Sequence, residues 1–187
     1  MNLPLLMLAL ALSTGALAQA QPAPEWTVVQ PQSKLGFAAS MNGDGFAGSF
    51  ARWAARIRFD PARLAASRVA VVVDMRSART GDTTRDEALP SSDWFAVARF
   101  PQAIFTASRF RALGGNRYVA DGSLKLRDKS APLSLPFTIT IAGSTATMKG
   151  SAIVDRRTLG VGQGQFATAD PVATSVRIDV SLVARRN

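Results

Sequence analysis

The stretch RYVADGSLKLRDKSAPLSLPFTITI, residues 117–141, decides the fold because its apolar side chains recur at every second position in two successive runs. A two-residue period is that of a β-strand with one dry face. The runs flank a turn around residues 128–132, so the stretch predicts a pair of neighbouring strands. The dry face touches either a packed core or a hydrophobic ligand, and its apolar members are Tyr118, Ala120, Leu124, Leu126, Leu133, Leu135, Phe137, Ile139 and Ile141.

The same alternation recurs along most of the chain. Trp53 and Ile57, for example, alternate with Arg56 and Arg58. About eight or nine short strands, joined by tight turns such as NGDG at residues 42–45, favour an all-β antiparallel sandwich or barrel. Periodicity alone does not choose between these two architectures, because both present one apolar face to the interior.

One segment, TGDTTRDEALPSSDWF at residues 80–95, breaks the strand pattern. A short helix beginning near Asp82 and ending before Pro90 is expected there, since acidic residues favour the first turn of a helix. Paired carboxylates could also serve a glycosidase, and Asp82, Asp86 and Asp93 are the candidates. Helix capping and pairing with local arginines explain the same carboxylates without catalysis.

The N-terminal segment MNLPLLMLALALSTGALAQA, residues 1–20, contains no charged side chain and is apolar from residue 3 to residue 12. A short apolar run followed by small residues is typical of a secretory signal peptide. Cleavage is expected after Ala18 or Ala20. The sequence therefore predicts a signal peptide over residues 1–18 and one exported domain over residues 19–187.

Composition excludes much familiar chemistry. The 187 residues include no Cys and no His, so thiolate nucleophiles, histidine bases and the usual zinc ligands are absent, and we expect no metal and no cofactor. The net charge of +9 fits either a solvated basic surface or attraction to an anionic lipid or phosphate-bearing ligand. Nucleic acid is not expected as a partner, because arginines and aromatic rings fall on opposite faces of the long strands.

The glycine-rich segment GVGQG, residues 160–164, is similar to a phosphate-binding loop in composition only. It lacks the spacing and the lysine of a P-loop, and no helix pattern follows it. A flexible loop or bulge between strands is the simpler interpretation.

Six segments taken in order carry a family resemblance. They are SKLGF, GSFARWAARIRFDPARLAASRVAVVVDMRSA, TRDEALPSSDWFAVARFPQAIFTASRF, YVADGSLKLR, PLSLPF and IVDRRTLGVGQGQFATADPVATSVRIDVSL. Together they cover nearly all of the exported domain and resemble the YceI-like family, known as periplasmic polyisoprenoid-binding proteins with a lipocalin-like barrel. Many relatives carry histidines in a pattern such as HSxVxFxVxH, where this chain has PQSKLGFAASM. Any role that those histidines have in relatives is therefore not expected in this chain, which contains no His.

The resemblance implies a closed antiparallel β-barrel of about eight strands, partly hollow, with a short helix near one end. An isoprenoid lipid or quinone would occupy the hollow, with its quinone ring or diphosphate head group near Arg85 or Arg156. Structural ion pairs with Asp86 or Asp155 are the alternative for these two arginines. The side chains expected to contact the apolar tail are Phe37, Trp53, Ile57, Trp94, Phe105, Tyr118, Leu124, Leu126, Leu135, Phe137, Ile139, Met148 and Ile178.

The expected function is therefore a periplasmic carrier or store of isoprenoid lipid or quinone, with no bond made or broken. An alternative is an envelope protein with a filled core, whose basic face contacts the membrane surface or a membrane-bound partner. A hydrolase that uses the carboxylates of residues 82–93 is a third hypothesis, weakened by the absence of histidine.

Overall fold

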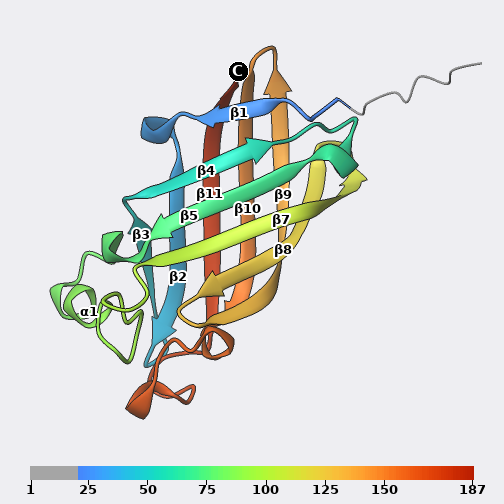
Figure 1. Cartoon of the computed structure of the whole chain (residues 1–187). Coiled ribbons are helices and arrows are strands. Elements are labelled where there is room, and N and C mark those ends of the chain that lie inside the picture. The colour runs from blue at the N-terminus through green and yellow to red at the C-terminus, as the bar shows by residue number, and fades with distance from the viewer. Residues whose placement is uncertain (1–20) are drawn as a thin grey trace, which may run out of the picture.

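A computed structural model of the chain describes residues 21–187, and the expected signal peptide lies outside them. In the described part, one antiparallel sheet curls round and closes on itself (Figure 1). The closure joins the first strand to the last, since Trp26 pairs with Arg186, and Trp26 also pairs with Ile57 on its other side. The expected antiparallel barrel is confirmed.

Eight strands of residues 21–187 make the closed ring, and each pairs with the next in spatial order. In that order they are β1 (Glu25–Val28), β4 (Trp53–Arg58), β5 (Arg68–Asp74), β7 (Gln102–Gly114), β8 (Arg117–Leu126), β9 (Lys129–Ala142), β10 (Thr145–Asp155) and β11 (Ser175–Arg186).

The remaining strands extend the barrel at one end, where the part of β11 that does not reach β1 pairs with β2 instead. Residues 184–186 of β11 pair with β1, whereas residues 177–181 pair with β2. The strand β3 then pairs with β2, and β6 pairs with β3. These additional elements and the helices are β2 (Lys34–Met41), β3 (Asp44–Phe50), β6 (Ala78–Arg79), α1 (Thr83–Ala88), and the 3-10 helices η1 (Gln30–Gln32), η2 (Leu64–Ala66), η3 (Met75–Ser77), η4 (Arg156–Leu159) and η5 (Gly164–Phe166).

The hairpin predicted from residues 117–141 is formed by β8 and β9. Tyr118 pairs with Phe137, and the register continues to Leu126 opposite Lys129. The turn is shorter than expected, because β9 already begins at Lys129 and leaves two residues in the turn. Arg127 has a φ of 56°, and two-residue hairpin turns favour positive φ.

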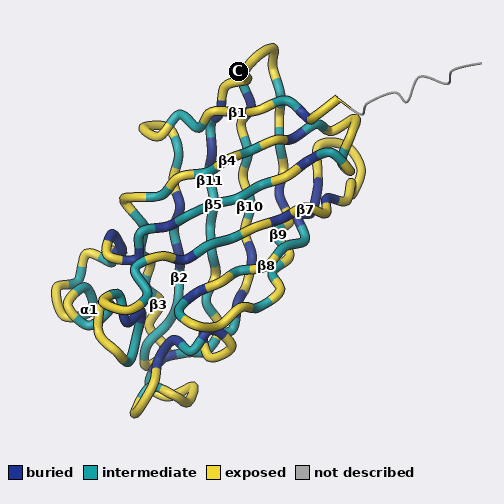
Figure 2. The backbone as a smooth tube through the Cα atoms, viewed as in Figure 1, coloured by how far each residue is buried: buried dark blue, intermediate teal, exposed yellow. Residues whose placement is uncertain are grey.

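Two hydrophobic clusters lie towards the two ends of the barrel. Figure 2 shows the buried positions along the strands. One cluster lies where β1 crosses the barrel and contains Trp26 and Phe59. The other lies towards α1 and contains Phe95 and Leu159. Trp53 packs against both clusters, so the two cores meet near the middle of the barrel.

A register shift in β7 changes which side chains face inwards. Phe105 and Ala107 pair with residues of β8 in simple alternation, and the ladder then skips one residue before Arg109. A bulge of this kind moves the following side chains to the opposite face. Phe110 is consequently buried, although simple alternation from Phe105 places it outside.

The short helix predicted near Asp82 is confirmed as α1. The Asp82 carboxylate accepts a hydrogen bond of 2.9 Å from the Arg85 amide, which caps the first turn. No helix of residues 21–187 is both long and apolar enough to span a membrane.

Candidate functional site

The barrel contains a cavity of about 260 Å³ that is lined by residues of both hydrophobic clusters. Inward-facing side chains of all eight ring strands except β1 line it, together with β2, β3 and the loops at the α1 end. Its wall is hydrophobic except for one charged residue, Arg156. A space of this size and character suits an apolar molecule. A water molecule there would lack the hydrogen-bond partners that it needs.

Thirteen of the fifteen predicted site residues line this cavity. Tyr118 does not, because its ring lies behind the wall and stacks on Phe137 at a centroid distance of 5.7 Å. Arg85 also lies outside the wall. The thirteen that the fold brings together are Phe37, Trp53, Ile57, Trp94, Phe105, Leu124, Leu126, Leu135, Phe137, Ile139, Met148, Ile178 and Arg156.

Sequence reasoning missed several residues of the wall. Phe59 continues the inward parity of Trp53 and Ile57, so the alternation could have identified it. Phe110 was hidden by the bulge in β7. Val69 and Val71 of β5 also line the wall, but the run RVAVVVD is apolar on both faces, so alternation could not separate its inner residues from its outer ones.

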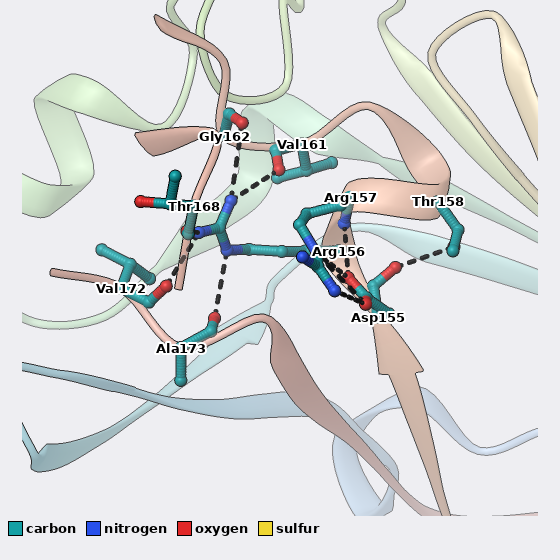
Figure 3. Close-up of polar contacts among 9 residues, drawn as sticks. All are labelled: Asp155, Arg156, Arg157, Thr158, Val161, Gly162, Thr168, Val172 and Ala173. Atoms are coloured by element: carbon teal, nitrogen blue, oxygen red, sulfur yellow. Dashed lines mark hydrogen bonds and ion pairs between the residues drawn. The ribbon is translucent and has the colours of Figure 1, made fainter. Parts of the chain in front are cut away.

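The loops at the α1 end are held together by the side chain of Arg156, which is only 3% exposed (Figure 3). Each of its five N–H groups donates to a backbone carbonyl. No carboxylate of the described residues forms an ion pair with it. The acceptors are the carbonyls of Ala173 for Nε at 3.0 Å, Val161 and Gly162 for Nη1 at 2.9 and 3.5 Å, and Thr168 and Val172 for Nη2 at 2.6 and 2.8 Å.

Burial lowers the pKa of the Arg156 guanidinium, and the nearby Asp155 carboxylate opposes this shift. An arginine nevertheless stays protonated in proteins, so a positive charge lies beside the cavity. The carbonyl oxygens replace the water that the charge lost. Asp155 itself pairs with Arg157 at 2.6 Å, so the alternative of a direct pair between Asp155 and Arg156 is wrong.

The glycine-rich segment has a structural role in this arrangement. Gly162 has a φ of +79°, and a Cβ atom there would collide with Nη1 of Arg156. The amides of Gly162 and Gln163 both donate to the Asp93 carbonyl at 2.8 Å. The expected loop between strands is confirmed, and it closes the barrel by joining the 156–173 loop to the turn that precedes β7.

That turn also contributes side chains to the closure. Trp94 lines the cavity and packs on Phe166 of the other loop at a centroid distance of 4.9 Å. Arg127 donates to the carbonyls of Ser92 and Trp94 at 2.9 and 2.8 Å. We call this assembly, residues 89–100 and 156–173 with Arg127, the arginine end of the barrel.

Arg85 stands beside the cavity without entering it. Its guanidinium lies 4.8 Å from the centroid of the Phe46 ring, and Phe46 lines the wall. Its ion-pair partner is Asp82 at 3.5 Å, so the alternative of a pair with Asp86 is wrong.

Two of the three candidate catalytic carboxylates, Asp82 and Asp86, serve the local structure. Asp86 accepts hydrogen bonds from both the hydroxyl and the amide of Thr80 at 2.7 Å, and these bonds lower the pKa of its carboxyl. A lowered pKa suits a structural acceptor rather than a proton donor. Within residues 21–187, no three acidic side chains gather in a way that could hold a metal ion.

The family model described as YceI-like domain matches residues 26–184, which include the whole barrel apart from the ends of β1 and β11. The chain belongs to the YceI-like family. The expected family and the expected fold are thereby confirmed.

Two curated relatives of this YceI-like chain are UPF0312 proteins. The UPF0312 protein of Yersinia enterocolitica is 32% identical over 97 residues, which cover 52% of this chain and 50% of that protein. The UPF0312 protein of Pseudomonas savastanoi pv. phaseolicola is 26% identical over 184 residues, covering 92% of this chain and 93% of that one.

Solved structures share the barrel. The crystal structure of Burkholderia cenocepacia BcnA is 29% identical, with a TM-score of 0.80, and the match covers 83% of this chain and 98% of that chain. A polyisoprenoid binding domain from Saccharophagus degradans is 11% identical, with a TM-score of 0.67, over 88% of this chain and 99% of that domain. The latter similarity is one of fold.

Proposed function

We propose that this YceI-like chain is a binding protein that holds the tail of an isoprenoid lipid or quinone inside the barrel and carries or stores it in the periplasm. The observation that carries the proposal is the cavity of about 260 Å³ with its hydrophobic wall. The thirteen predicted residues that line it are the proposed contacts. Export rests on the expected signal peptide over residues 1–18.

The wall provides the free energy of binding. Removing apolar carbon from water yields roughly 0.8 kcal/mol per CH₂, so one five-carbon isoprene unit contributes about 4 kcal/mol before the cost of ordering the tail. A few buried units therefore give useful affinity without any polar contact.

The polar contacts favour a neutral head group. Arg156 is the one charged residue of the wall, and backbone carbonyls already occupy all five of its N–H groups. A diphosphate inside the cavity would lose its water and find no free donor, which is costly. A quinone ring or an alcohol loses much less, so we propose a neutral isoprenoid.

Two further observations support the proposal. A domain of the same fold from Saccharophagus degradans is described as polyisoprenoid binding. The alternative of an envelope protein with a filled core does not account for a cavity of this volume.

Organic extraction of protein purified from its native compartment, followed by mass spectrometry, tests the proposal. We expect a prenyl lipid at up to one molecule per chain. Purified protein should also bind geranylgeraniol more tightly than geranylgeranyl diphosphate, which has the same tail. Recovery of no lipid together with no binding of either compound would contradict the proposed function, and tighter binding of the diphosphate would contradict the neutral head group.

Charge placed in the wall provides the matched variants. Phe137→Arg and Leu126→Arg should abolish binding, because each puts a cation into the hydrophobic cavity. Ile153→Arg is the control, since this side chain of β10 points outwards and is 61% exposed. Equal affinity in Phe137→Arg and Ile153→Arg would show that the ligand lies elsewhere.

A further inference from the structure

The end of the cavity nearest β1 is closed by packed rings. Phe59 is the central one, with its ring centroid 5.6 Å from Phe110, 5.4 Å from Tyr118 and 5.7 Å from Phe137. Phe59, Phe110 and Phe137 line the cavity, whereas Tyr118 and Trp26 lie behind them. We call these five residues the aromatic end.

Phe59 is fixed from behind by its own backbone. Its carbonyl accepts a hydrogen bond of 2.9 Å from Nε1 of Trp26, and its amide donates to the Pro24 carbonyl at 3.2 Å. Both Phe59 and Trp26 are only 3% exposed. These buried hydrogen bonds hold the backbone of Phe59, and the packed neighbouring rings restrict its side chain.

The buried cluster around the Phe59 ring also contains small side chains. The same buried cluster contains Ala107 of β7, Ala146 of β10 and Ala184 of β11, which are 4%, 3% and 1% exposed. Small side chains on three strands leave the volume that the aromatic rings fill. Removal of the Phe59 ring would therefore lengthen the cavity along the barrel axis instead of opening it to solvent.

We infer that Phe59 sets the maximum length of isoprenoid tail that the barrel accepts. This inference rests on the proposed function. A tail whose head group lies at the arginine end gains contact with each added unit until it reaches the Phe59 ring. Further units meet a fixed, close-packed obstacle and gain nothing.

A second position tests the same rule in the opposite direction. Ala55 of β4 lines the cavity two residues before Ile57, nearer to the arginine end than Phe59. A larger side chain there would stop the tail earlier. Phe59→Ala should thus lengthen the accepted tail, and Ala55→Phe should shorten it.

The experiment measures affinities for a ladder of prenyl alcohols from farnesol, with three isoprene units, through geranylgeraniol to solanesol, with nine. In the unaltered protein, affinity should rise with each unit and then level off. In Phe59→Ala the levelling should come at least one unit later, with a rise of roughly tenfold or more at the added unit. In Ala55→Phe it should come at least one unit earlier.

Phe59→Leu guards against a folding defect, because it keeps an apolar side chain and should give a smaller shift in the same direction. Tyr118→Phe is the control, since this ring lies behind the wall and its replacement should not move the limit. An unchanged limit in Phe59→Leu, Phe59→Ala and Ala55→Phe would overturn the inference while leaving the proposed function intact. Failure of every variant and of the unaltered protein to bind any prenyl alcohol would overturn both.

Discussion

The two ends of the barrel are closed by different kinds of interaction. The aromatic end is closed by apolar packing, because the Phe59 ring contacts three other aromatic rings. The arginine end is closed by a buried cation and carbonyl oxygens, with Arg156 at the centre (Figure 3). The aromatic end lies mainly on paired strands, whereas residues 89–100 and 156–173 of the arginine end are mostly loops, which are generally more mobile than strands. We therefore expect the ligand to exchange through the arginine end.

The largest expected effect comes from Arg156→Met, which removes the cation and leaves its carbonyl acceptors without a donor. The free energy of unfolding should fall by about 3–5 kcal/mol, as for other broken buried charge networks. A bound prenyl alcohol should also leave faster. Urea denaturation and competition kinetics would measure both effects.

The neighbouring Arg157 gives the matched control. Its side chain is 51% exposed and pairs only with Asp155, so Arg157→Met should cost less than about 1 kcal/mol and leave the release rate unchanged. Equal losses in the two variants would contradict the role given to the buried guanidinium.

Gly162→Ala should disturb the same end by a steric route. The new methyl group would collide with Nη1 of Arg156, and the positive φ adds backbone strain, so we expect a loss of about 1–3 kcal/mol. Gly143 also has a positive φ, 59°, but a Cβ atom added there would meet nothing within 4 Å, so Gly143→Ala isolates the strain. A smaller loss in Gly162→Ala than in Gly143→Ala would remove the steric argument.

At the aromatic end, Trp26→Phe should have a smaller effect. The change keeps a ring but removes the hydrogen bond to the Phe59 carbonyl, which is worth about 1 kcal/mol. The release rate of a bound prenyl alcohol should stay the same, because this end does not open. If Trp26→Phe released the prenyl alcohol as fast as Arg156→Met does, the proposed difference between the two ends would be wrong.

Neither closure depends on a carboxylate in direct contact, so acid should act elsewhere first. Hydrogen bonds from Arg111 and then Ser134 lower the pKa of Asp121 to about 2, on the outer face of the barrel. A lowered folded-state pKa means that the stabilisation is complete above about pH 4 and is lost as the pH falls through about 2.

Asp121→Asn should therefore flatten the fall in stability over this pH range without changing ligand release. Denaturation curves between pH 5 and pH 2 would show the effect, which should be modest because the Arg111 side chain is 53% exposed. Loss of the bound ligand in step with Asp121 titration would contradict the independence of the closures from the outer ion pair.

Much of the fold could be predicted from local pattern, because alternation and capping are recorded in neighbouring residues. The β8–β9 hairpin and the Asp82 cap are the clearest cases. Phe110 was missed because one bulged residue reverses the parity of everything after it. The cavity itself left no local signal, since a strand face looks the same against a ligand and against a core, and the resemblance to a family supplied it.

The closure around Arg156 was out of reach for a different reason. Its acceptors are backbone carbonyls spread over residues 161–173. Every residue has a backbone carbonyl, so the sequence does not show which carbonyls accept these bonds. Gly162 was the one visible trace, because only glycine tolerates both its φ and the close approach of Nη1.

The central claim is that the space between Phe59 and the arginine end holds an isoprenoid tail. A crystal structure of the protein with bound geranylgeraniol tests it most directly. The account predicts one elongated ligand along the barrel axis, with its apolar tip against the Phe59 ring and Trp53 and Phe137 at its sides. An interior without ligand, with geranylgeraniol bound only to the outer surface of the strands, would contradict it.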